Sequence, residues 1–110
     1  MLFLLYPAKK LDYDTPVHVE HHTQPLFVDQ AAGLIKVLKT LSADDVAALM
    51  SLSPALAELN VGRYGAWTRK FTQHNARQAV LAFNGDVYEG LQAGTLSAAR
   101  LEWAQEHVAI

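Results

Sequence analysis

Cysteine is absent from this sequence of 110 residues, which excludes a disulfide framework and metal sites built on thiolates. No apolar run approaches the roughly 20 residues that a membrane-spanning helix needs. The apolar stretch Met1–Tyr6 is too short for a secretory signal, has no basic region before it and is followed at once by Pro7. We therefore expect a cytoplasmic protein.

Sequence patterns typical of phosphate loops, hydrolases and zinc enzymes are also missing. The six glycines form no closely spaced series, and neither a nucleophile elbow nor a His-x-x-x-His pattern occurs. One expected loop holds the remaining candidate metal ligands, which are His18, His21, His22, Glu20 and Asp14. Their spacing is too loose for a recognisable site, so we expect neither a metal nor a cofactor.

Acidic residues are absent between Leu59 and Gly85, although the whole chain carries a net charge of −2. The bases of this stretch are interleaved with aromatic residues, and they are Arg63, Arg69, Lys70 and Arg77. Local charge of one sign creates a field that favours an anion. The anion could be a phosphate backbone, a nucleotide or an acidic surface of a larger fold.

The apolar pattern predicts a mostly helical chain with two short strands. Uninterrupted apolar runs at residues 2–6 and 79–83 are typical of strands buried on both faces. Helical periodicity and start signals predict helices at residues 26–41, 43–52, 54–63 and 98–110. Two strands of this length do not make a stable sheet alone. We therefore expect an α/β fold: a fragment, without an internal domain boundary, of a larger single-domain protein that continues beyond Ile110.

Serine and aspartate mark the expected helix starts. Ser42 followed by Asp45 resembles a capping box, and Ser53 before Pro54 is a second N-terminal signal. Ser97 is expected to cap the final helix. Asp86 is expected to cap a short helical turn that contains Val87, Tyr88 and Leu91.

Two stretches closely resemble the YaaA family of bacterial peroxide-stress-resistance proteins. They are PAKKLD at residues 7–12 and NARQAVLAFNGDVYEGL at residues 75–91. The second motif is long and specific, and the helices between the motifs are similar in length and order, so the resemblance covers the whole chain. The family is normally longer, which makes this chain resemble its N-terminal part. One departure is Tyr6, where the family usually has Ser.

The resemblance implies a compact α/β fold and a role in limiting free intracellular iron and DNA damage during peroxide stress. It also implies binding of double-stranded DNA through a basic cleft and a helix–hairpin–helix element, which would be the helices at 26–41 and 43–52. The turn between them contains no glycine. The residues expected to contact DNA are Lys9, Lys36, Lys39, Ser42, Arg63 and Arg77, and those expected to build the motif are Pro7, Asp12, Gly85, Asp86 and Tyr88.

Two of the motif residues have ordinary structural roles as alternatives. Asp12 lies three residues beyond Lys9 and could be its charge partner. Tyr88 is expected to be a packed aromatic residue whose hydroxyl has a hydrogen-bond partner.

Two other functions stay open. The first is an enzyme whose pocket centres on Lys9 and which acts on a nucleotide-like or carbonyl-containing small molecule. The second is a purely structural role, in which the basic residues hold the chain to its missing C-terminal half. We expect a monomeric DNA-binding protein rather than an enzyme.

Overall fold

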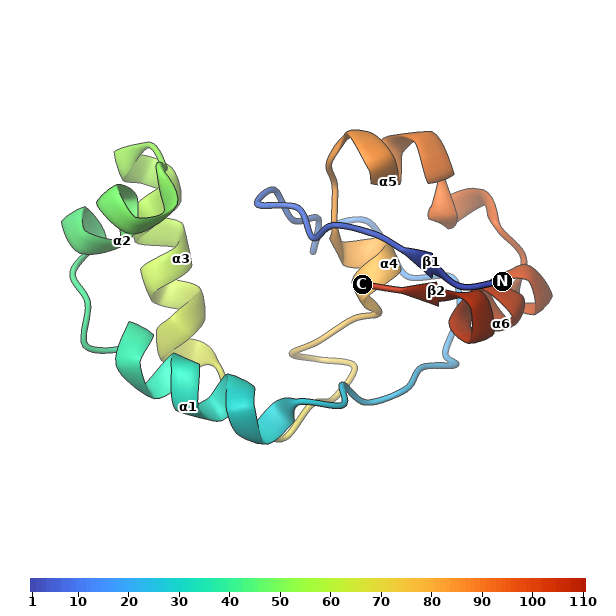
Figure 1. The fold of residues 1–110 in the computed structure, drawn as a ribbon, viewed down its shortest axis with the longest axis horizontal. Helices are drawn as coiled ribbons and strands as arrows, with labels where there is room; N and C mark the ends of the chain where they lie inside the picture. The colour runs from blue at the N-terminus through green and yellow to red at the C-terminus, as the bar shows by residue number, and fades with distance from the viewer. The chain divides into compact units, whose positions relative to one another are not determined.

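The computed structural model describes residues 1–110 as two compact units, coloured along the chain in Figure 1. Unit 1 contains residues 1–23 and 72–110, and unit 2 contains residues 24–71. The elements of unit 2 are α1 (Val28–Leu38), α2 (Ala43–Met50) and α3 (Pro54–Ala66). Those of unit 1 are β1 (Phe3–Leu4), α4 (Ala79–Ala82), α5 (Asp86–Leu91), the 3-10 turn η1 (Ala93–Thr95), α6 (Ala98–His107) and β2 (Val108–Ala109).

Local capping signals place the helices of unit 2. The Ser42 hydroxyl accepts a hydrogen bond from the Asp45 amide at 3.1 Å, and the Asp45 carboxylate accepts one from the Ser42 amide at 3.0 Å. Ser53 caps α3 through the Leu56 amide. These three bonds confirm the predicted starts of the second and third helices. The first helix is shorter than the predicted 26–41 at both ends. No side chain caps its N-terminus at Phe27, and the amides of Thr40 and Leu41 bond to carbonyls three residues back, which ends the α-helical pattern.

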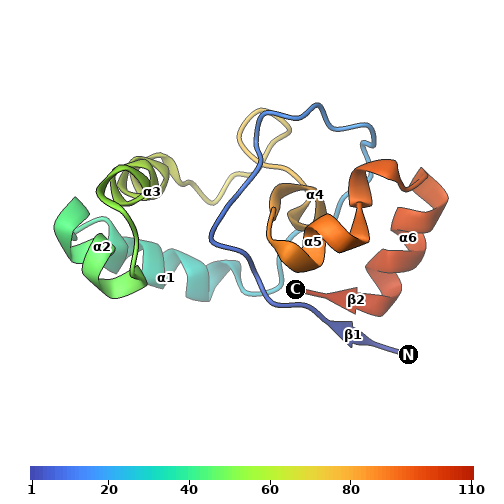
Figure 2. The same cartoon turned by 90° about the horizontal axis from the view of Figure 1, so that it is seen from above.

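The core of unit 2 lies between α2 and α3, which stand side by side in Figures 1 and 2. Val46 on α2 and Ala57 on α3 are fully buried. Asn60 is the buried polar residue of this core, and its side-chain amide donates to the Leu56 carbonyl at 2.8 Å. α1 also contacts α3.

The predicted strand at residues 2–6 is shorter and more exposed than expected. Only Phe3 and Leu4 form β1, which pairs in parallel with β2 at the other end of the chain. Both are exposed, so the prediction of a strand buried on both faces is wrong for this chain. The reason is that the sheet has two strands, and nothing within the 110 residues covers its open side.

The predicted strand at residues 79–83 is wrong, because these residues form the helical turn α4. The Phe83 amide donates to the Ala79 carbonyl at 2.9 Å, which closes the turn. A short apolar run cannot distinguish a strand from a turn of helix by periodicity alone. Only Phe83 is extended, and it forms an isolated antiparallel bridge with Leu11.

Asp86 and the final helix also differ from the predictions. Gly85 is the N-cap of α5 and Asp86 is its first residue, so Asp86 is not a capping side chain. Ser97 caps α6 as predicted, through the Arg100 amide at 3.3 Å. The helix ends at His107 rather than Ile110, because Val108 and Ala109 extend to pair with β1.

Candidate functional site

The two motifs at residues 7–12 and 75–91 meet in unit 1 through their backbones. The Asp12 amide donates to the Ala82 carbonyl at 2.7 Å, and the Asn84 amide donates to the Lys10 carbonyl at 3.0 Å. Gly85 lies so close to Ala8 that a Cβ atom on Gly85 would stand 3.1 Å from the Ala8 Cβ. The motifs are therefore two sides of one packed unit, although they are far apart in sequence.

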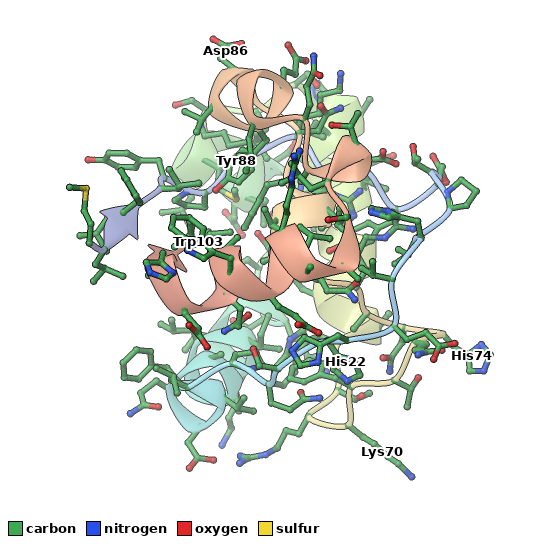
Figure 3. The ribbon with its side chains drawn as sticks, turned by 90° about the vertical axis from the view of Figure 1, so that its right-hand side faces the viewer. His22, Lys70, His74, Asp86, Tyr88 and Trp103 are labelled. Carbon is green, nitrogen blue, oxygen red and sulfur yellow. The ribbon has the colours of Figure 1, made fainter.

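Tyr88 adds a side-chain link between the same segments. Its ring is buried and its hydroxyl donates to the Tyr6 carbonyl. Burial raises the pKa of the Tyr88 phenol, so the hydroxyl keeps the proton that it donates. This confirms the prediction of a packed aromatic residue with a satisfied hydroxyl. In Figure 3 Tyr88 lies on the inner side of α5, whereas Asp86 lies at its outer end.

Arg77 is held by the loop that follows the first motif. One terminal nitrogen of its guanidinium donates to the Thr15 carbonyl and the other to the Tyr13 carbonyl, both at 2.8 Å. The guanidinium also lies 5.8 Å from the centre of the Tyr13 ring. The planar fork of arginine fits two adjacent acceptors in this way. Arg77 thus ties the loop to the segment that leads into α4.

Asp12 bends the same loop into a turn. One carboxylate oxygen accepts the amides of Asp14 and Thr15, both at 3.0 Å. The Thr15 hydroxyl, then the Thr15 and Asp14 amides, lower the pKa of Asp12 from 3.8 to about 2, and the charge of Arg77 acts in the same direction. Asp12 is therefore ionised at neutral pH.

A pocket of about 390 Å³ lies within unit 1. Its polar walls include Asp12, His18, Arg77 and Glu89, and Tyr88 contributes an apolar surface. The His18 ring is fixed because its Nε2 atom donates to the Leu96 carbonyl at 2.8 Å. Four of the residues singled out from the sequence thus come together here, and Lys9 is not among the lining residues.

A second pocket, of about 360 Å³, lies within unit 2 between α1 and the segment after α3. Lys36 in the last turn of α1 and Lys39 at its C-cap line it together with Trp67 and Arg69. The Lys39 ammonium donates to the Trp67 carbonyl at 3.4 Å. The Trp67 ring meets Phe71 edge to face, with centroids 5.9 Å apart. Three cationic side chains and one aromatic ring therefore share a single concave surface, the Lys36–Lys39 pocket.

Arg69 forms an ion pair with Asp29 at the same surface. Both side chains are largely exposed, at 60% and 81% respectively. Exposed pairs of this kind contribute about 0–1 kcal/mol and are screened by salt. A phosphate can therefore compete with Asp29 for the guanidinium at little cost.

The turn between α1 and α2 has its backbone amides already bonded. The amides of Lys39, Thr40 and Leu41 donate to carbonyl oxygens of α1, and that of Ser42 donates to Asp45. The Ser42 amide is the main group that lowers the pKa of Asp45 below its ordinary value. The turn thus offers side chains to a phosphate rather than backbone amides.

The predicted DNA-contacting residues divide between the two units. Lys9 and Arg77 belong to unit 1, and Lys9 lies exposed on the loop after β1. The residues in unit 2 are Lys36, Lys39, Ser42 and Arg63. Arg63 is half-buried in the last turn of α3, where a cation complements the helix dipole. Of these residues, Lys36 and Lys39 share a pocket.

The partners of the site residues could not be found from spacing in the sequence. Asp29 and Arg69 are separated by α2 and α3, and the acceptors of Arg77 are main-chain carbonyls that any residue could supply. The interleaving of Trp67 with basic residues was the one visible signal for the pocket on unit 2. This interleaving indicated the segment after α3 but not its contact with α1.

Two further findings concern metals and membranes. No three His, Asp or Glu side chains lie close enough together to hold a metal ion. His74, for example, points outward from its loop in Figure 3. No helix is long and apolar enough to cross a bilayer.

These features define a mostly helical chain with one pair of short parallel strands, in which two distant motifs pack together and a basic pocket lies on the first long helix. A sequence profile described as "Peroxide stress protein YaaA" matches residues 1–110. The chain therefore belongs to the YaaA family, whose members also carry the label UPF0246.

Relatives from several bacteria match the whole chain. It is 91% identical to a UPF0246 protein of Bordetella petrii, 83% identical to one of Bordetella pertussis and 64% identical to one of Polaromonas naphthalenivorans. Each alignment covers all 110 residues but only 43% of the relative. The chain is thus a fragment of a longer protein, as the sequence predicted.

Proposed function

We propose that the full-length protein binds double-stranded DNA and protects it during peroxide stress, as a member of the YaaA family. The observation that carries this proposal is the Lys36–Lys39 pocket, where three cations gather beside Trp67. Lysine ammonium groups and an arginine fork are the groups that proteins use to hold phosphates. A limit on free iron belongs to the same proposal through family membership.

The proposed mechanism is electrostatic and relies on side chains. Lys36 and Lys39 contact neighbouring phosphates from α1, and Arg69 exchanges its exposed partner Asp29 for a third phosphate. Backbone amides of the α1–α2 turn contribute little, because each already has an acceptor. Asp44 and Asp45 in the first turn of α2 repel a phosphate at that helix end. The α1–α2 pair thus acts in the proposed helix–hairpin–helix role through α1.

The other predicted contacts, Lys9, Ser42, Arg63 and Arg77, are proposed as supporting residues. Lys9 is an exposed base on the loop after β1. Arg77 retains unused donors after its two carbonyl bonds, because a guanidinium carries five. An enzyme centred on Lys9 has less support, since Lys9 does not line the unit 1 pocket.

Binding of the full-length protein to duplex DNA across a range of salt concentrations tests the proposal. Each phosphate contact contributes about −0.9 to the slope of log affinity against log salt. We expect Lys36→Gln and Lys39→Gln each to weaken binding and to reduce the slope by about 1. Fluorescence anisotropy with a labelled duplex measures both quantities.

Arg100→Gln is the matched control, because Arg100 is an exposed base on α6 outside the proposed contacts. It should leave the slope unchanged. If both lysine variants keep the slope of the unmodified protein, the Lys36–Lys39 pocket is not the DNA site.

A further inference from the structure

We propose that β1 is an internal strand of a larger sheet in the full-length protein. A strand from the remainder of that chain, outside these 110 residues, pairs with the free edge of β1 and covers its open face. The inference is independent of DNA binding, because it concerns how the protein is completed rather than what it binds.

The free edge follows from the pairing with β2. The Leu5 amide donates to the Ala109 carbonyl at 2.9 Å, and Phe3 and Leu4 stand opposite Val108 and Ala109. Backbone groups of successive residues in a strand point to opposite edges, so the amide and carbonyl of Leu4 point away from β2. They form the unpaired row that an edge strand offers to another strand.

The side chains of this segment are apolar and exposed. Leu2, Leu4 and Tyr6 lie on one face and are 63%, 77% and 86% exposed, and Phe3 on the other face is 45% exposed. Apolar residues on both faces without alternation are typical of strands inside a parallel sheet that is covered on each side. A contiguous exposed patch of this kind marks a surface that another segment covers.

The length of the remaining chain favours a segment of the same protein as the partner strand of β1. The relatives are longer than this chain, which spans 43% of each of the three compared above. That remainder has ample length for a strand and a covering layer, whereas two strands of two residues are too few for a stable sheet. A segment of the same chain is also present at a high effective concentration, which favours it over a second copy.

Amide hydrogen exchange of the full-length protein, resolved by residue with NMR, tests the proposal. The amide of Leu4 should be protected to within about tenfold of the Leu5 amide, which already has a partner in β2. Leu5 is thus an internal control in the same strand. Rapid exchange at Leu4, with or without protection at Leu5, would overturn the proposal.

Dilution and substitution complete the test. Protection at Leu4 should not change on dilution of the protein, and a loss on dilution would assign the edge to a second copy instead. Leu4→Asp in the full-length protein should lower the thermal midpoint, and the matched variant Leu4→Val should keep it close to that of the unmodified protein. An unchanged midpoint for Leu4→Asp would show that the face stays open to solvent.

Discussion

Asp12 and Arg77 are charged side chains whose partners lie in one loop, and most of these partners are main-chain groups. Asp12 accepts two amides and Arg77 donates to two carbonyls, so together they hold residues 12–15 in place. The sequence predicted Asp12 as a motif residue and suggested Lys9 as its charge partner. The strongest effects on Asp12 come instead from Thr15 and Asp14, with Arg77 as the contributing cation. Main-chain partners of this kind leave no pattern in a sequence.

The lowered pKa of Asp12 makes a pH-dependent contribution to stability. The pKa rises from about 2 in the folded state to 3.8 when the turn is lost, so the contribution is complete above pH 3.8 and disappears as the pH falls toward 2. Thr15→Val, which removes the leading hydroxyl donor, should raise the pKa of Asp12 toward 3.8. A carboxyl NMR titration of the full-length protein measures this change. A pKa that stays near 2 in the variant would show that the hydroxyl has no part in it.

Arg77→Lys separates the structural role of Arg77 from its charge. Lysine keeps the positive charge but cannot reach both the Tyr13 and Thr15 carbonyls. We expect a loss of about 1–3 kcal/mol in the free energy of unfolding, with little change in the salt dependence of DNA binding. Chemical denaturation and anisotropy measure the two quantities. An unchanged denaturation midpoint would show that the loop does not depend on this fork.

At the scale of elements, the helix starts that a serine caps could be predicted from the sequence, and the strands could not. Ser42, Ser53 and Ser97 each cap the helix that the sequence assigned to them, because a cap is a contact within three residues. The strands depend on partners at the other end of the chain or outside it. Residues 79–83 carry the apolar run typical of a strand, but α4 satisfies its hydrogen bonds locally.

Gly85 and Gly90 are a matched pair for testing the contact between the two motifs. A Cβ atom at Gly85 would press on Ala8 at 3.1 Å, whereas one at Gly90 meets nothing within 4 Å. Gly85→Ala should destabilise the full-length protein by about 1 kcal/mol through overpacking. Gly90→Ala, inside α5, should stabilise it by about 0.5–1 kcal/mol. Denaturation midpoints measure both, and equal effects would show that the approach to Ala8 is not tight.

At the scale of the whole chain, the 110 residues form a discontinuous unit and a continuous unit that interrupts it in sequence. Unit 1 unites the two family motifs, and unit 2 contributes the Lys36–Lys39 pocket. The family and the incompleteness of the chain could be predicted from the sequence. The division of the candidate residues between the units could not, because it depends on long-range packing that no local pattern encodes.

Replacing unit 2 by a short flexible linker in the full-length protein tests this division of roles. Because the motifs bond to each other within unit 1, the variant should keep their amide protection. It should lose most of its salt-dependent affinity for duplex DNA, since Lys36, Lys39 and Arg69 are removed. Hydrogen exchange and anisotropy give the two readouts. Retained salt-dependent affinity would place the DNA contacts in unit 1 or in the rest of the protein.

The parallel pairing of Phe3 with Val108 delays the folding of β1 during synthesis on the ribosome. The first strand leaves the exit tunnel early, but its partner is made only when nearly all of these 110 residues have been translated. Until then Leu2–Leu5 is an unpaired apolar segment of the nascent chain. Exposed segments of this kind are prone to aggregate, and chaperones bind them. Pairing between distant residues is also slow, because a large loop must close first. Within these 110 residues, Phe3 and Leu4 should therefore be among the last to reach their final place.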